Sequence, residues 1–109
     1  MKRGDVLLVT PHGDYGKPRP AVLVQTDRLN KAHASMIVAL FTTDITEASF
    51  FRLTIEPEKY NGLEDTSQIM IDKLAAIPLK RVKKKIGRLT EEQLDDLDIS
   101  LALVLGLAG

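Results

Sequence analysis

The sequence contains no cysteine and only two histidines, His12 and His33. Disulfide bonds and thiolate metal sites are therefore excluded. No residues around either histidine have the spacing that is typical of metal ligands. We therefore expect no metal site and no other cofactor.

Long hydrophobic runs are also absent. The apolar stretch that follows the charged amino-terminal residues, Val6–Val9, is far shorter than a signal-peptide core or a membrane span. We therefore expect a cytoplasmic protein that makes no membrane contact. Basic and acidic residues number 15 each, and this zero net charge argues against a protein that coats nucleic acid by bulk electrostatics.

What the chain does contain is an ordinary globular composition. Of its 109 residues, 44% are hydrophobic and 28% are charged, so intrinsic disorder is not expected over most of the length. This length supports one hydrophobic core. The prediction is a single domain that spans residues 1–109.

Short apolar and β-branched segments, separated by turn residues, predict a mainly β domain. Residues 5–10 and 20–26 are expected to pair as a hairpin across the loop at 11–18, which contains proline and glycine. The longest apolar run, 35–43, predicts a central strand. Further strands are predicted at 51–55, 68–78 and 83–89. Five or six short strands with mostly short connections favour a small barrel.

The end of the chain predicts one α-helix. Thr90 and Gln93 form a capping-box pattern, and Gly106 is suited to end the helix. Five apolar residues between them keep helical spacing: Leu94, Leu97, Leu101, Val104 and Leu105. Ile99 and Leu103 are apolar on another face, and a subunit interface is one explanation for them.

Charge is distributed unevenly along the second half of the chain. Residues 80–88 carry lysines and arginines and no acid, whereas residues 91–98 carry acids and no base. The acids suit the positive dipole end of the helix that is predicted to begin there. The basic run can be a solvated loop, or it can be an edge that faces RNA or another protein.

More specific motifs lie near the amino terminus and in the middle of the chain. Residues 3–5 read Arg-Gly-Asp before a hydrophobic strand, and residues 19–20 read Arg-Pro at the start of the next strand. The strand at 37–42 ends in threonine, and residues 65–67 read Asp-Thr-Ser before another apolar segment. In this order and spacing the chain resembles the MazF/PemK family of type II toxin–antitoxin endoribonucleases over nearly its whole length.

This resemblance implies a fold and an activity. The implied fold is a small SH3-like, CcdB/PemK-like β-barrel of five to six strands with a carboxyl-terminal α-helix. The implied activity is sequence-specific, metal-independent cleavage of single-stranded RNA that leaves 2′,3′-cyclic phosphate and 5′-OH ends and arrests growth. The implied partners are a cognate antitoxin and a second copy of the chain in a homodimer.

The resemblance also implies site residues. Arg19 has a planar guanidinium that can pair two phosphate oxygens, and the flanking prolines Pro18 and Pro20 stiffen its backbone. Thr42 corresponds to a hydroxyl that bonds the scissile phosphate. Asp72 corresponds to an acid that some members use as a general base, and it can equally be an ordinary ion-pair partner. Three further residues are candidates for RNA binding: Lys17, Thr43 and Ser67.

Two departures from the family pattern affect these expectations. The loop at 11–18 is shorter than in typical members and lacks a secure counterpart for an acid that some members use, although Asp14 is nearby. His12 as an acid–base group and Tyr15 as a stacking surface are candidates to compensate. Met70 stands where some members have a second catalytic arginine, which leaves Arg19 as the main cation.

Two other functions compete with the nuclease hypothesis. A CcdB-like toxin would inhibit DNA gyrase through its carboxyl-terminal residues, but the tail at 102–109 lacks an aromatic residue. A catalytically silent relative would only bind an antitoxin or RNA.

Overall fold

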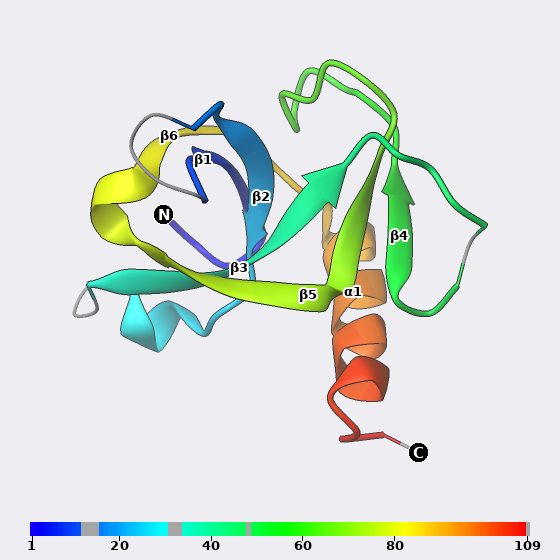
Figure 1. Ribbon diagram of the computed structural model, residues 1–109. Coiled ribbons are helices and arrows are strands. Elements are labelled where there is room, and N and C mark those ends of the chain that lie inside the picture. The colour runs from blue at the N-terminus through cyan, green and yellow to red at the C-terminus, as the bar shows by residue number, and fades with distance from the viewer. Residues whose placement is uncertain (12–15, 31–33, 48, 109) are drawn as a thin grey trace.

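A computed structural model describes residues 1–11, 16–30, 34–47 and 49–108. The described chain forms one bent sheet and one long helix (Figure 1). The elements are β1 (Asp5–Val9), β2 (Arg19–Leu23), β3 (Ser35–Thr42), β4 (Arg52–Ile55), β5 (Ser67–Pro78), β6 (Val82–Arg88) and α1 (Glu91–Val104), with short 3-10 helices at Asp27–Leu29 and Leu79–Arg81.

The six strands form a single antiparallel sheet in the order β4-β5-β3-β2-β1-β6. The predicted hairpin is present as β1 and β2, and the predicted central strand, β3, lies between β2 and β5. The sheet is strongly curled (Figure 1). The mainly β fold with a carboxyl-terminal helix is therefore confirmed. The expected barrel is not closed, because the edge strands β4 and β6 do not pair in the described part of the chain.

Two clusters of buried side chains stabilise this sheet. The larger one lies where α1 covers β4 and β5, and it includes Val6, Phe41, Ile69 and Leu97. The smaller one is centred on Leu7 and other residues of β1, β2 and β3. Side chains alternate along these strands, so neighbouring residues such as Val6 and Leu7 contribute to different clusters.

The predicted capping box begins α1. The Thr90 side chain accepts a hydrogen bond from Gln93 N, and the Gln93 side chain accepts one from Thr90 N. Gly106 has a φ of +74° just after the helix, as predicted for its end. Of the predicted apolar face, Leu105 is an exception, because it is 55% exposed.

The Arg-Gly-Asp segment ties the amino terminus to the rest of the fold. The Asp5 side chain is 1% exposed and accepts hydrogen bonds from Lys2 N at 2.7 Å and from Arg88 Nη1 at 2.9 Å. Lys85 Nζ lies 3.4 Å from the same Asp5 carboxylate. Arg3 donates to Val24 O and pairs with Asp98 of α1. This segment therefore joins β1, β6 and α1 and does not line the site described below.

No helix in the described ranges is long and apolar enough to span a membrane.

Candidate active site

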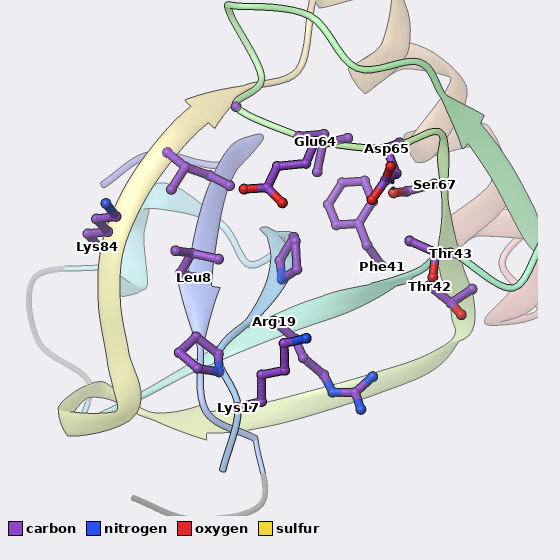
Figure 2. Close-up of a pocket in the computed structure, with 15 residues that line it drawn as sticks. Leu8, Lys17, Arg19, Phe41, Thr42, Thr43, Glu64, Asp65, Ser67 and Lys84 are labelled. Atoms are coloured by element: carbon purple, nitrogen blue, oxygen red, sulfur yellow. Dashed lines mark hydrogen bonds between the residues drawn. The ribbon is translucent and has the colours of Figure 1, made fainter. Parts of the chain in front are cut away.

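A groove of about 580 Å³ opens over β1, β2 and β6 and faces the loop between β4 and β5 (Figure 2). Its lining comes from β1, β2, β3, β5 and β6 and from the segments that precede β2 and β5. Among the described residues it is lined by Leu8, Lys17, Pro18, Arg19, Pro20, Phe41, Thr42, Thr43, Gly62, Leu63, Glu64, Asp65, Ser67, Lys84 and Ile86. Five of the predicted site residues, including Arg19 and Thr42, are therefore brought together.

Arg19 is the first residue of β2, where it pairs with Val9 of β1. Its side chain is exposed, and it makes no hydrogen bond or ion pair with the described residues. Lys17 lies close to it on the same side of the groove (Figure 2). Because the Arg19 guanidinium is not engaged by a described carboxylate, its paired donors are available for an anionic ligand.

Thr42 and Ser67 are adjacent because β3 ends where β5 begins. The register pairs Thr42 with Gln68, the residue after Ser67. Thr42 Oγ1 accepts a hydrogen bond from Asp44 N at 3.1 Å, so its hydroxyl proton remains available to a ligand. Thr43 is exposed at the same rim.

Ser67 is less suited to bind a phosphate than its position suggests. Its side chain is buried, and Ser67 Oγ donates its proton to Asp65 O at 2.9 Å. A hydroxyl has one proton to donate, so this bond would have to break before Ser67 could donate to an anion. We assign Ser67 a structural role at the start of β5.

Asp72 does not line the groove of the single chain. It is exposed on β5, in a stretch where Leu40 of β3 lies opposite residues 70–73. This irregularity breaks the alternation of side chains, and both Asp72 and Lys73 are exposed. Met70 is half-buried and pairs with Arg52 of β4. The predicted site residues His12 and Tyr15, and Asp14 near them, lie outside the described residues.

Three charged groove residues were not predicted as site residues: Glu64, Asp65 and Lys84. Glu64 and Asp65 directly precede the Thr-Ser pair that carries part of the family resemblance. Lys84 belongs to the basic run at 80–88, whose members have different tasks. Lys84 lines the groove, whereas Lys85 and Arg88 contact Asp5. The register between β1 and β6 decides which of these basic residues faces the groove.

The loop between β4 and β5 is held tightly against β6. Asn61 is 0% exposed, and its side chain bonds backbone groups of Glu56, Glu58 and Leu63. Gly62 has a φ of +72°, and a Cβ placed there would lie 2.3 Å from Ile86 O. A Cβ on Gly87 would lie 2.4 Å from Tyr60 O. The acidic side of the groove is therefore presented by a braced loop.

No group of three or more metal-ligating side chains is present among the described residues.

Comparison with known proteins assigns the chain to a family. The sequence model of the PemK-like, MazF-like toxins of type II toxin–antitoxin systems matches residues 2–105. A probable endoribonuclease MazF of Mycolicibacterium smegmatis is 41% identical over 110 residues, and the match covers 100% of both chains.

Solved structures show the same fold. Mycobacterium tuberculosis toxin MazF-mt6 is 19% identical, with a TM-score of 0.81 over 96% of this chain and 99% of that one. An endoribonuclease from a mycobacterial species, solved in complex with its cognate antitoxin, is 20% identical, with a TM-score of 0.82 over 100% and 98%. The chain of a MazE–MazF structure from Deinococcus radiodurans is 15% identical, with a TM-score of 0.77 over 99% and 98%. By its sequence match over residues 2–105 and its full-length relative, the chain belongs to the family of PemK-like, MazF-like toxins of type II toxin–antitoxin systems.

Proposed function

We propose that this toxin is an endoribonuclease that cuts single-stranded RNA in the groove beside Arg19, without a metal. One observation carries this proposal. The guanidinium of Arg19, which has no partner among the described residues, shares a groove of about 580 Å³ with the hydroxyls of Thr42 and Thr43. Membership of the MazF-like family and the 41% identical relative, a probable endoribonuclease, support RNA as the substrate.

The proposed reaction is transesterification within the RNA. The 2′-OH attacks the adjacent phosphorus while the bond to the 5′-oxygen of the next nucleotide breaks, which gives a 2′,3′-cyclic phosphate and a 5′-OH. Arg19 would pair two phosphate oxygens and stabilise the charge that develops on them, and the Thr42 hydroxyl would donate to the same phosphate. This reaction needs no protein nucleophile.

The reaction also needs a group that takes the proton of the 2′-OH and one that supplies a proton to the leaving oxygen. Asp65 lies in the groove next to Ser67 and on the same side as Thr43 (Figure 2), so it is a candidate for proton transfer within one chain. Asp72 is exposed outside this groove. A role for Asp72 as the base therefore requires that a second subunit bring it to a groove.

A homodimer and an antitoxin complete the proposal. Ile99, Leu103, Leu105 and Leu107 are 63%, 41%, 55% and 79% exposed on or just after α1. Beside them, an apolar cavity of about 410 Å³ lies between α1 and β3. Burying this surface against a second copy would remove it from water. We further propose that a cognate antitoxin covers the groove in the cytoplasm and that the unopposed toxin arrests growth.

The test is cleavage of a long, poorly structured RNA in excess EDTA, with product ends mapped. We expect discrete cuts with 5′-OH ends by the wild type. Arg19→Ala should cut about 10²-fold more slowly or worse, and Arg19→Lys should recover little, because an ammonium does not pair two oxygens in the same geometry.

The matched control is Arg28→Ala, which removes an exposed arginine outside the groove. It should cut like the wild type. If a folded, dimeric wild type leaves this RNA intact, the nuclease proposal fails, and gyrase inhibition or silent antitoxin binding becomes the question. If Arg19→Ala and Arg28→Ala lose equal activity, Arg19 has no special role.

A further inference from the structure

The two sides of the groove carry opposite charges. Arg19 and Lys17 lie on one side, and Glu64 and Asp65 on the other (Figure 2). The Glu64 carboxylate points from the braced loop into the groove (Figure 2), and it makes no hydrogen bond or ion pair with the described residues. A carboxylate in this place repels phosphate, so it must face a different part of a bound RNA.

Below Glu64 the groove has an apolar floor. Leu8 of β1 pairs with Pro20 of β2 on one side and with Lys84 of β6 on the other. Paired residues on neighbouring strands point to the same face, about 5 Å apart, so the three form a continuous row. Ile86 lines the groove near them. This floor offers apolar contact to a flat base, with Lys84 at its edge for a phosphate.

Glu64 is presented to this floor with little freedom in its backbone. Gly62 and Gly87 allow the loop and β6 to approach each other at distances that a Cβ would not permit. The buried Asn61 side chain holds the loop backbone on both sides. A preorganised group loses less entropy when it binds, so it discriminates better between ligands.

We propose that Glu64 reads one base of the RNA and selects cytosine or adenine over uracil. An ionised carboxylate only accepts hydrogen bonds. Cytosine and adenine present an amino donor at the position where uracil presents a carbonyl oxygen. Uracil therefore places an unpaired acceptor against the Glu64 carboxylate. This inference rests on the proposed ribonuclease function and names the specificity of the same groove.

The experiment compares wild type, Glu64→Gln and Glu64→Ala on a single-stranded RNA library with randomised positions around the cut. The wild type should prefer cytosine or adenine over uracil at one position by roughly tenfold or more in kcat/KM. In Glu64→Gln the ratio should fall towards one, because an amide both donates and accepts and can therefore bind uracil. Glu64→Ala should lose the same preference.

Glu58→Gln is the matched control, because it makes the same change at an exposed acid of the same loop that lies outside the groove. It should keep the wild-type preference. A second control replaces the selected cytidine with its analogue that lacks the amino group. The wild type should cut this RNA less well than the cytidine substrate but no worse than the uracil substrate, because the analogue has lost the donor without gaining an acceptor. Glu64→Ala, which has no group to accept from the amino group, should cut the cytidine and analogue substrates equally well.

Three outcomes would overturn the inference, and they are distinguishable from one another. If the wild type cuts no RNA, the proposed function is wrong, and this inference, which rests on it, is wrong as well. If the wild type cuts but Glu64→Gln keeps the base preference unchanged, only the reading by Glu64 is wrong. If Glu64→Gln slows cleavage equally at every sequence, Glu64 acts in the reaction or in positioning and not in base selection.

Discussion

Replacing Asp5 by asparagine should destabilise this fold strongly without removing an atom from the groove. The Asp5 side chain is 1% exposed, and its carboxylate accepts hydrogen bonds from Lys2 N and Arg88 Nη1. Asparagine has nearly the same shape but no charge, and its nitrogen donates where the carboxylate accepts. The substitution therefore leaves Arg88 and Lys85 facing a neutral group.

The expected cost follows from these contacts. A hydrogen bond to a charged partner contributes about 1.5–3 kcal/mol, and the Lys85 pair, at 3.4 Å with a half-exposed ammonium, adds at most about 1 kcal/mol. The Arg88 side chain is 38% exposed, so water can replace part of the interaction that its guanidinium loses. The loss of stability is therefore smaller than for breaking a wholly buried ion pair. We expect a loss of about 2–3 kcal/mol, or roughly 10 °C in Tm for a domain of this size.

The assay is urea unfolding followed by circular dichroism, at one protein concentration because the proposed dimerisation would add to apparent stability. The midpoint should fall while the slope stays constant. Asp95→Asn, at an exposed helix position, is the control and should stay within about 0.5 kcal/mol of the wild type. A comparably small change for Asp5→Asn would refute the structural role, and loss of cleavage by a fully stable Asp5→Asn would place the residue in the site.

Three further predictions concern the loop, the helix and the proposed dimer. Gly87→Ala forces a Cβ to within 2.4 Å of the loop backbone. It should lower the free energy of unfolding in urea by about 1–3 kcal/mol and weaken the base preference in RNA cleavage. Stability equal to that of the wild type would show that the loop moves aside freely. Thr90→Ala removes one half of the capping box and should lower the free energy of unfolding by about 1 kcal/mol. Thermal unfolding measures this loss, with Thr90→Ser as the control that keeps the hydroxyl. The double variant Ile99→Ser, Leu103→Ser should convert a dimer into a folded monomer by light scattering, whereas an unchanged mass would move the interface away from α1.

The strands and the helix could be predicted because their signals are local. The run at 35–43 and the Thr90–Gln93 pair each identify an element without information from the rest of the chain. Arg19 and Thr42 were predicted from family resemblance, and each lies at the end of a strand that reaches the groove. Signals of this kind also explain why the strand boundaries agree within a few residues.

Glu64, Lys84 and Asp72 show where this reasoning stops. Whether Lys84 or Lys85 faces the groove depends on the register of β6 against β1, which are far apart in the sequence and whose pairing is interrupted by bulges. Asp72 lies in the part of β5 where residues 70–73 oppose Leu40. No period in the sequence determines the direction of a side chain there. Such positions require the folded sheet.

The fold separates the groups that stabilise it from the groups that would act on RNA. Asp5, Asn61 and the two close-approach glycines are engaged within the protein. Arg19 and Glu64 are exposed and have no described partner. Because a side chain that contributes no contact to the fold can be changed without cost to it, Arg19→Ala and Glu64→Gln should leave Tm unchanged while they alter rate and base preference, respectively. Substitutions at Asn61, Gly62 or Gly87 should lower Tm, and they should affect cleavage only by displacing the loop between β4 and β5. A toxin built this way can change its RNA target by substitutions in the groove while its fold is preserved.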